Sequence, residues 1–367
     1  MLTAMDRLDM TVEELDTPAL VIDLDAMERN IARMAEFFAG VPADLRPHAK
    51  THKSGVLAQR QLAAGARGIT CAKLGEAEVM VAGGIRDILI ANQIVGAKKI
   101  ARLVHLNAWA EVKVDVDHLE NARQLSAAAA AQGVMVGVLV EVDVGNRRCG
   151  VAGPREAVKL AQEVARLPGL EFRGLMGYEG HAVLIPERER RAALCREAMT
   201  RLLEAVEAVR AAGLPVDIVS AGGTGTFDLT GRFPGITEVQ AGSYLFMDAR
   251  YLEVEGLPFE PALTVLATVI SRPARDRAVT DAGRKALSTD FGLPRVLGVE
   301  GVDVLGLSEE HGKLALHRPS RELRVGDKLH FLPSHVCTTV DLHDRYYGVR
   351  GGRVEVIIDV AARGRFG

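Results

Sequence analysis

The side chains best suited to chemistry are concentrated in residues 46–54, "RPHAKTHKS". This stretch contains His48, Lys50, His52 and Lys53. If "DLRPHAK" is a strand, Arg46, His48 and Lys50 share one face, and Lys50 lies at the end of the strand. A lysine that is partly withdrawn from water becomes an amine able to form a Schiff base with a carbonyl carbon. The same sequence would also fit two solvent-exposed lysines at a turn. Other features of the chain must distinguish a reactive lysine from this alternative.

Two glycine-rich turns supply such a feature. "SAGGTGTF", residues 220–227, and "QAGSY", residues 240–244, each come at the end of a predicted strand. Backbone amides in such turns can bind a phosphate, although a tight turn alone also calls for glycine. An amine after an early strand, combined with phosphate-binding turns after late strands, indicates a cofactor with both an aldehyde and a phosphate. Pyridoxal 5′-phosphate is such a cofactor.

A third stretch, "LPSHVCTTVDLHD" at residues 332–344, has the composition of a metal site. His335 and Cys337 are two positions apart, so on a strand they would point to the same face. Imidazole and thiolate favour zinc or another borderline-soft divalent ion. Two ligands leave the metal open to water or substrate, as in catalytic sites. A core cysteine beside a half-buried histidine explains the pair equally well, and both interpretations stand.

The elements that must position these residues fall into two patterns. Between residues 19 and 250, short apolar runs alternate with helical segments, which predicts parallel βα units. About nine strand segments are recognisable: eight would close a (β/α)₈ barrel with one outside it, and an open doubly wound sheet is the alternative. Later segments are strand-like without long helices. We therefore expect a barrel over residues 18–250 and an antiparallel β domain over residues 251–367 that includes residues 1–17.

Composition narrows the class of protein. Of the 367 residues, 48% are hydrophobic and 25% are charged, which is the balance of a soluble globular protein. The formal net charge of −3 gives no reason to expect nucleic acid or an anionic membrane as a partner. No apolar run approaches the roughly 20 residues of a membrane span, and we see no signal peptide. The four scattered cysteines indicate reduced thiols and a cytoplasmic location.

Taken together and in order along the chain, these stretches resemble the family of D-threonine aldolases and D-serine dehydratases, which are fold-type III pyridoxal-phosphate enzymes. The motifs that carry the resemblance are "LDTPALVIDLDAMERNI", "RPHAKTHK", "GITCAKLGEAEVM", "VEVDVGNRRCGV", "SAGGTGTF", "EVQAGSYLFMD", "TDAGRKA", "SEEHG" and "LPSHVCTTVDLHD". The resemblance implies an alanine-racemase-like barrel, a C-terminal β domain and a homodimer. It also implies pyridoxal 5′-phosphate and a divalent metal, which would be Mn, Mg or Zn.

The resemblance also implies roles for individual residues. Lys50 would be the Schiff-base lysine, and His335 and Cys337 would be the metal ligands. Arg148 in "RRCG" and Tyr178 in "GLMGYEGH" match positions near the cofactor, although a surface arginine and a packed tyrosine are the plainer interpretations. The phosphate cradle would consist of Gly223, Thr224, Gly225, Gly242, Ser243 and Tyr244.

The expected activity is cleavage of a D-β-hydroxy-α-amino acid, such as D-threonine, to glycine and an aldehyde. Dehydration by a D-serine or D-3-hydroxyamino-acid dehydratase is the alternative, because His-x-Cys is typical of that branch and His-x-Asp of the aldolases. His181, directly after "YEG", is the candidate base, although a helix-start role is as plausible. An amino-acid racemase ranks lower because it would leave the His335 and Cys337 pair without a purpose, and a cofactor carrier would not need the β domain.

Overall fold

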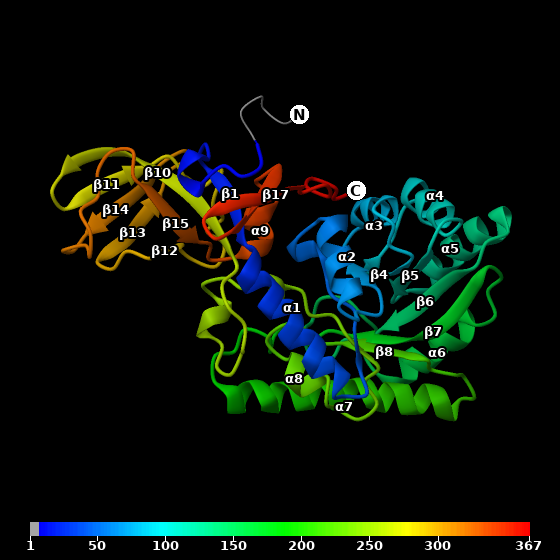
Figure 1. The fold of residues 1–367 in the computed structure, drawn as a ribbon. Helices are drawn as coiled ribbons and strands as arrows, with labels where there is room; N and C mark the ends of the chain where they lie inside the picture. Colours follow the sequence, from blue (N-terminus) through cyan, green and yellow to red (C-terminus); the bar gives the residue numbers. More distant parts are fainter. Residues whose placement is uncertain (1–6) are drawn as a thin grey trace. The chain divides into compact units, whose positions relative to one another are not determined.

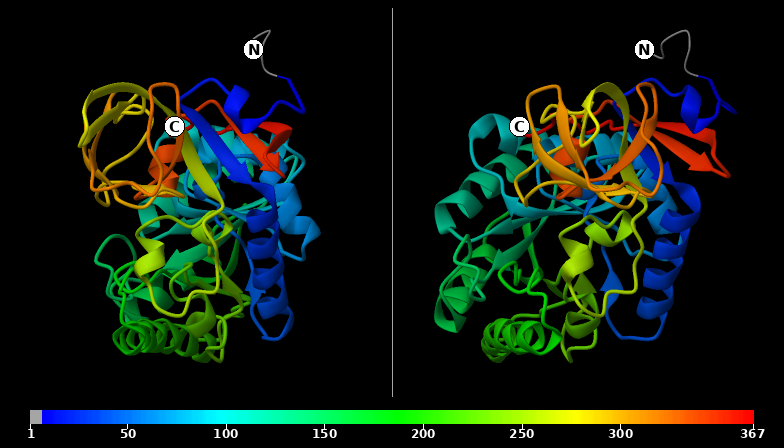
Figure 2. Two further views of the ribbon diagram at one scale, coloured as in Figure 1. Left: turned by 60° about the vertical axis from the view of Figure 1, so that its left-hand side comes forward. Right: turned by 90° about the vertical axis from the view of Figure 1, so that its left-hand side faces the viewer.

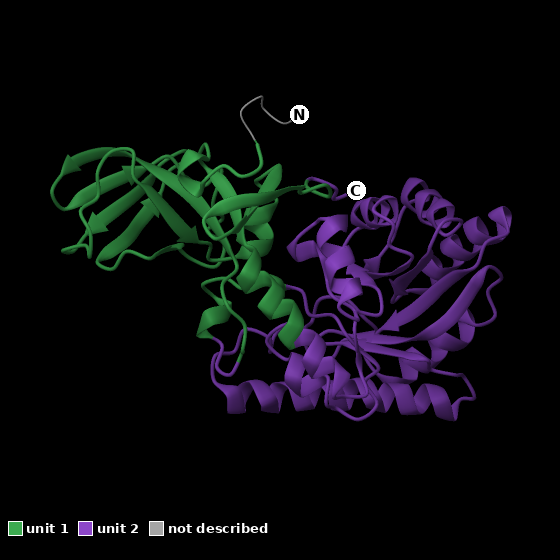
Figure 3. Ribbon diagram, in the orientation of Figure 1, with its two compact units in different colours: residues 1–33, 243–253, 257–363 green, residues 34–242, 254–256, 364–367 purple. Residues whose placement is uncertain are grey.

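The computed structural model describes residues 7–367, and its contacts divide the chain into two units (Figure 3). The sheet unit comprises the described residues up to Arg33, together with Ser243–Glu253 and Leu257–Arg363. The barrel unit comprises Met34–Gly242, Val254–Gly256 and Gly364–Gly367. The barrel expected from the sequence began at residue 18 and so included the strand Ala19–Asp23. The contacts within the structure group this strand with the sheet unit.

The barrel unit is built on eight parallel strands, each pair of consecutive strands being joined through a helical segment (Figure 1). The strands are β2 (Asp44–Leu45), β3 (Ile69–Cys71), β4 (Asp87–Gln93), β5 (Glu111–Val116), β6 (Val136–Glu141), β7 (Leu170–Gly177), β8 (Ile218–Ala221) and β9 (Glu238–Val239). The helices are α2 (Gly55–Ala63), α3 (Leu74–Ala82), α4 (Ala97–Leu106), α5 (Leu119–Gln132), α6 (Pro154–Val164), α7 (Arg188–Ala211) and α8 (Phe227–Thr230).

The sheet of the barrel unit closes on itself. Its strand order is β2-β9-β8-β7-β6-β5-β4-β3. The two ends then meet, because Arg67 N donates to Leu45 O at 2.9 Å and Thr70 N donates to Pro47 O at 2.9 Å. An apolar layer of Leu89, Leu139, Met176 and Ile218 fills the interior. The expected (β/α)₈ barrel is confirmed, and the open doubly wound sheet is excluded.

The sheet unit confirms the expected β domain and includes the N-terminal strand. Its strands are β1 (Ala19–Asp23), β10 (Leu263–Ala274), β11 (Arg277–Thr280), β12 (Arg295–Leu297), β13 (Val302–Leu307), β14 (Gly312–Leu316), β15 (Lys328–Leu332), β16 (Arg345–Arg350) and β17 (Arg353–Asp359). They form a strongly curved sheet, yellow to red in Figure 2 apart from the blue β1. β1 pairs antiparallel with β10 and parallel with β16, which explains why its first four residues are all buried.

The described residues contain two further α-helices and four 3₁₀ helices, η1 (Val12–Glu14), η2 (Ala49–Thr51), η3 (Ser243–Leu245) and η4 (Tyr251–Glu253). Helix α1 (Leu24–Ala39) follows β1 directly, and α9 (Val336–Val340) is a single short turn between β15 and β16. No described helix combines the length and the apolar character that crossing a bilayer requires.

A buried ion-pair network lies inside the barrel. Arg46 is fully buried; its Nε donates to Glu238 Oε2 at 2.9 Å, and its Nη1 donates to Asp87 Oδ1 at 2.7 Å. Lys113 Nζ donates to the same Asp87 oxygen at 2.8 Å. Burial lowers the pKa of Arg46, but the charges of Glu238 and Asp87 raise it by more, so the guanidinium stays charged.

Arg46→Met should therefore destabilise the barrel strongly. The substitution leaves Glu238, which is 1% exposed, without its cation, and breaking a buried pair in this way costs about 3–5 kcal/mol. Urea unfolding measures the loss. Arg67→Met is the matched control, because Arg67 and its partner Asp44 are about half exposed, and we expect it to cost less than about 1 kcal/mol. Equal losses in the two variants would contradict this account.

Candidate functional site

Lys50 lies in a 3₁₀ helix, Ala49–Thr51, and not on a strand. Strand β2 ends at Leu45. Between β2 and Lys50 there is only one isolated β-bridge, which pairs His48 with Thr70. The expected alternation of side chains along a strand is therefore wrong at this point. The expected location is nevertheless correct, because the 3₁₀ helix begins where the backbone leaves the barrel. Lys50 Nζ lies 5.7 Å from the centroid of the Tyr178 ring.

The other basic residues of this stretch have different environments. Lys53 is buried, and its Nζ donates to Glu76 Oε1 at 2.6 Å, so its amine is committed to an ion pair. Burial, followed by the charge of Lys50, lowers the pKa of His48 far below its usual value, so His48 stays neutral. Burial also lowers the pKa of His52 to about 4. Lys50 is thus the amine of this stretch best placed for covalent chemistry.

Arg148 and Tyr178 lie together at the same end of the barrel. The Arg148 Cζ atom is 5.5 Å from the centroid of the Tyr178 ring. Arg148 Nη2 lies 3.5 Å from Glu141 Oε1, and Gln93 Nε2 donates to the other oxygen of Glu141. A half-exposed arginine held between a carboxylate and an aromatic ring is oriented rather than free in solution. The arrangement supports a role for Arg148 at the site.

Three possible ligand atoms, from Asp117, Glu141 and Cys149, lie within 4.8 Å of one another beside this arginine. The nearby guanidinium of Arg148 already provides positive charge to Glu141. Burial, followed by the charge of Glu141, raises the pKa of the Cys149 thiol, which favours the protonated sulfur. We therefore interpret this group as the surroundings of Arg148 and not as a metal site.

The glycine turns after β8 and β9 require glycine for close approach. A Cβ at Gly225 would lie 1.7 Å from Val183 O, and one at Gly242 would lie 2.7 Å from His48 O. A Cβ at Gly223 would lie 3.4 Å from Cε2 of Tyr178. Gly242 therefore packs on the backbone next to Lys50, and Gly223 packs on the tyrosine that Lys50 faces. The two turns and the lysine, 170 or more positions apart in the sequence, are brought together.

The side chain of Glu179 holds the turn after β8 through hydrogen bonds. It is fully buried, and its Oε2 accepts from Gly222 N at 3.0 Å. Its Oε1 accepts from Thr226 Oγ1 at 2.7 Å and from Thr230 Oγ1 at 2.6 Å. One carboxylate thus fixes both ends of the turn.

Glu179→Ala should lower both stability and cofactor affinity. It leaves an N–H and two hydroxyl groups buried without their acceptor, each worth about 1–3 kcal/mol, so we expect a loss of roughly 3 kcal/mol. Denaturant unfolding and pyridoxal-phosphate titration measure the two effects. Glu197→Ala, at an exposed ion pair on α7, is the control and should change neither. Wild-type cofactor affinity in Glu179→Ala would refute the organising role.

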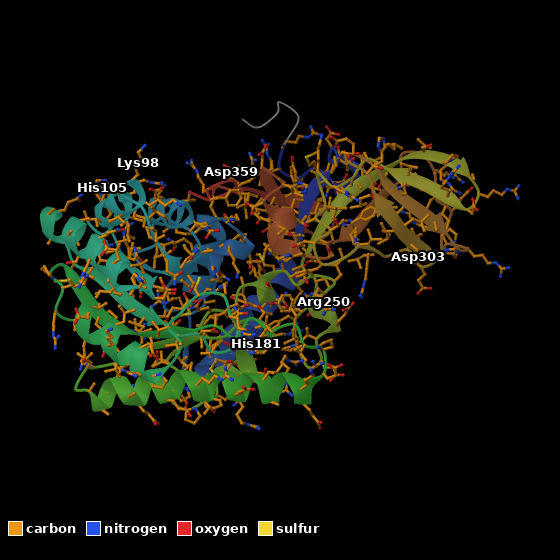
Figure 4. All side chains as sticks on the ribbon, turned by 180° about the vertical axis from the view of Figure 1, so that it is seen from behind. Lys98, His105, His181, Arg250, Asp303 and Asp359 are labelled. Atoms are coloured by element: carbon orange, nitrogen blue, oxygen red, sulfur yellow. The ribbon has the colours of Figure 1, made fainter. Side chains whose placement is uncertain are left out.

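His181 lies in the segment between β7 and α7 and is labelled in Figure 4. Its imidazole packs against Gly145 in the loop that also carries Arg148, with Cε1 3.3 Å from the position of a Cβ there. Its Nδ1 is buried and has no hydrogen-bond partner among the described residues. The histidine is therefore near the site, and its role as a base remains a prediction.

The predicted metal ligands lie at the start of α9 rather than on a strand. His335 is the residue that caps α9, and Cys337 lies in its first turn, because β15 already ends at Leu332. The strand expected here is wrong, but the two side chains hydrogen-bond to each other. Burial lowers the pKa of His335, whereas Cys337 and then Asp290 raise it by more, to about 9.

Neighbouring contacts connect this pair to the second glycine turn. Cys337 Sγ lies 4.0 Å from Ser243 Oγ, and Ser243 is the residue directly after Gly242. Asp248, which is fully buried, accepts from Val336 N at 3.0 Å and from Tyr251 N at 2.9 Å. The segment after β9 and the start of α9 are therefore held together within the sheet unit.

Sequence reasoning missed three residues that the structure places around the predicted ones: Glu141, Glu179 and Asp290. Each is a carboxylate that forms an ion pair or a hydrogen bond with a predicted site residue or with the turn that carries it. The available signal was proximity in a motif: Glu179 follows Tyr178 in "GYEGH", and Glu141 lies in "VEVDVGNRRCGV" with Arg148.

Comparison with known proteins extends these observations. The profile of "Alanine racemase, N-terminal domain" matches residues 22–250, and that of "Putative serine dehydratase domain" matches residues 262–349. The chain is 42% identical to a D-threonine aldolase from an Arthrobacter species, over 95% of this chain and 93% of that protein. It is 39% identical to a 3-hydroxy-D-aspartate aldolase from Paracoccus denitrificans, over 97% and 94% of the two chains.

Solved structures agree with the sequence matches. The crystal structure of a D-threonine aldolase from Filomicrobium marinum matches with a TM-score of 0.97 and 41% identity, over 100% of both chains. A D-threo-3-hydroxyaspartate dehydratase from Delftia sp. HT23 matches with a TM-score of 0.88 and 34% identity, over 95% of this chain and 98% of that one. The chain therefore belongs to the pyridoxal-phosphate-dependent, alanine-racemase-like family of D-threonine aldolases and D-serine dehydratases, and it is a lyase.

Proposed function

We propose that this protein cleaves D-β-hydroxy-α-amino acids, of which D-threonine is the simplest test, to glycine and an aldehyde. The observation that carries the proposal is the gathering of Lys50, Arg148 and Tyr178 beside the glycine turns. It occurs in a chain whose whole length is similar to aldolases. The D configuration rests on those relatives.

The residues at the barrel end fit pyridoxal 5′-phosphate. Gly225 and Gly242 let the two turns pack closely on the backbone of Val183 and of His48, so both turns lie at the barrel end beside Lys50, and the backbone amides of such turns can bind a phosphate. Lys50 would hold the cofactor through its amine, and the phosphate would lie on Gly223, Thr224, Gly225, Gly242, Ser243 and Tyr244. When bound, the cofactor supplies an electron sink next to the α-carbon of the substrate.

The surrounding side chains have separate tasks in this proposal. Arg148 and Tyr178 would orient the cofactor ring, since they pack against each other and the ring of Tyr178 lies beside Lys50. His181 accepts the proton of the substrate's β-hydroxyl group, which starts cleavage of the Cα–Cβ bond. Burial and the charge of Lys50 keep the imidazole of His48 neutral, so His48 adds no positive charge next to Lys50.

The donor set of His335 and Cys337 fits a divalent metal. An imidazole and a thiol at hydrogen-bonding distance supply two ligands and leave room for water or substrate. We propose zinc ahead of Mn or Mg, because a thiolate prefers the softer ion. A metal held there would polarise an oxygen of the substrate as a Lewis acid.

The runner-up is dehydration of the same class of substrate to an oxo acid and ammonia. The observation that favours it is the thiol at position 337, together with 36% identity to a D-threo-3-hydroxyaspartate dehydratase from Delftia sp., over 90% of this chain and 93% of that protein. The higher identity to aldolases favours cleavage.

We further propose that the protein is a homodimer and that it is located in the cytoplasm. Light scattering tests the homodimer, and cell fractionation tests the location.

One reaction separates the two activities. The purified protein is loaded with pyridoxal 5′-phosphate and Zn²⁺ or Mn²⁺, and it is incubated with D-threonine. Acetaldehyde with glycine and 2-oxobutanoate with ammonia are quantified in the same sample, with Lys50→Ala as the blank. Acetaldehyde that disappears in the blank supports the aldolase, and 2-oxobutanoate would mean that the dehydratase interpretation is correct. Racemised threonine without either product would refute both.

A further inference from the structure

We propose that Asp290 is the positioning residue of the metal pair. It holds the imidazole of His335 in the tautomer and orientation that leave Nε2 for the ion. This inference rests on the proposed function, which assigns a metal to His335 and Cys337. It concerns a carboxylate that lies 45 positions before that histidine and outside the motif that contains it.

The contact between the two side chains is direct and short. His335 Nδ1 lies 2.6 Å from Asp290 Oδ2. A carboxylate only accepts hydrogen bonds, so Nδ1 must carry the proton and donate it. When the ring gives up its second proton to bind an ion, the lone pair is therefore on Nε2, which is the arrangement found when a histidine binds a metal and donates its other N–H to a carboxylate.

The carboxylate itself cannot turn freely. Asp290 Oδ1 accepts from Ser288 Oγ at 2.6 Å and from Thr338 Oγ1 at 3.0 Å. Thr338 is a residue of α9, three positions after His335. Both oxygens of Asp290 are therefore engaged, and the element that carries the histidine also holds the carboxylate that orients it.

The loop that carries Asp290 is anchored to both flanks of α9. Ser288 N donates to Thr339 Oγ1 at 3.2 Å, and Ser334 Oγ donates to Ser288 O at 3.1 Å. His343 Nε2 donates to Ala286 O at 2.8 Å. These bonds come from residues before, within and after α9. A loop held at so many points belongs to a built support and not to a chance surface contact.

Phe291 fixes the remaining freedom of the imidazole. Its ring stacks on that of His335, with the centroids 4.1 Å apart and the planes at 9°. The hydrogen bond sets the direction of the ring and the stacking sets its plane. Together they determine where Nε2 points before any ion arrives, and such preorganisation raises affinity because less freedom is lost on binding.

Zinc affinity tests the inference without turnover. The full-length, cofactor-loaded protein is titrated with Zn²⁺ in competition with a chromophoric chelator. Loss of a carboxylate that supports a metal-binding histidine typically costs 10–100-fold in affinity, and we expect about that loss for Asp290→Ala. Asp290→Asn keeps an acceptor oxygen without the charge, so its loss should be smaller. This graded order is not expected from a general defect in folding.

The control is the exposed Asp303, labelled in Figure 4, which lies 3.4 Å from His317 and is 73% exposed. Asp303→Asn should leave Zn²⁺ affinity unchanged. Unchanged affinity in both Asp290 variants, with binding lost in His335→Ala, would overturn the positioning role and leave the metal pair intact. A wild-type protein that does not bind Zn²⁺ would overturn both. If Asp290→Ala fails to fold, the Asn variant decides: wild-type affinity in that variant overturns the inference.

Discussion

Lys50→Ala should abolish the lyase activity, with a fall in turnover of at least about 10⁴-fold. The amine is the only group in the proposed site that can bond covalently to the aldehyde of the cofactor and also exchange protons with the substrate. His48 is neutral and buried, and Lys53 is bound to Glu76. Neither neighbour can take over the task. Product formation from D-threonine measures the loss.

A second readout separates loss of the covalent bond from loss of the fold. Borohydride reduction followed by mass spectrometry should attach the cofactor to the peptide that contains Lys50 in the wild type and to no peptide in the variant. Lys98→Ala is the matched control, because that lysine projects from α4 into solvent (Figure 4) and should keep full activity. Attachment of the cofactor to Lys53 in the wild type would show that the wrong lysine was identified.

The order of elements could be predicted from the sequence because each βα unit has its own local signal. Buried parallel strands are continuous apolar runs, as in "VGVLVE", and the helices between them have polar faces. The β domain could likewise be predicted, because its segments are strand-like and no long helical pattern separates them. What local patterns could not show is that β1 pairs with β10 and β16, because those hydrogen bonds join residues more than 240 positions apart.

The candidate site shows the same division between local and distant information. Lys50, Arg148, Tyr178 and the glycine turns were predicted from motifs, and the structure brings them together. The strand expected around position 335 was wrong, because two residues of β-like spacing do not reveal that a helix begins there, with Val336 N donating to the distant Asp248. Asp290 could not be predicted, since nothing in "STDFG" indicates a partner 45 positions later.

His335→Ala and Cys337→Ala should each remove the metal dependence of the reaction and lower kcat/KM by about 10²-fold or more. A bound metal stabilises developing charge by several kcal/mol, and each 1.36 kcal/mol corresponds to a factor of ten in rate. Zn²⁺ binding and turnover are measured on the same samples. His317→Ala, at an imidazole that is 67% exposed in the same unit, should change neither quantity.

Cys337→Asp tests the thiol more sharply than its removal does. A carboxylate at this position keeps a two-ligand site but exchanges a soft donor for a hard one, so the preference among added ions should move from Zn²⁺ toward Mn²⁺ and Mg²⁺. Turnover should return above that of Cys337→Ala when Mn²⁺ is supplied. If the wild type already prefers Mn²⁺ to Zn²⁺, and Cys337→Ala keeps that preference, the sulfur is not a ligand. Cys337 would then act through its contact with Ser243, at the turn proposed to hold the phosphate.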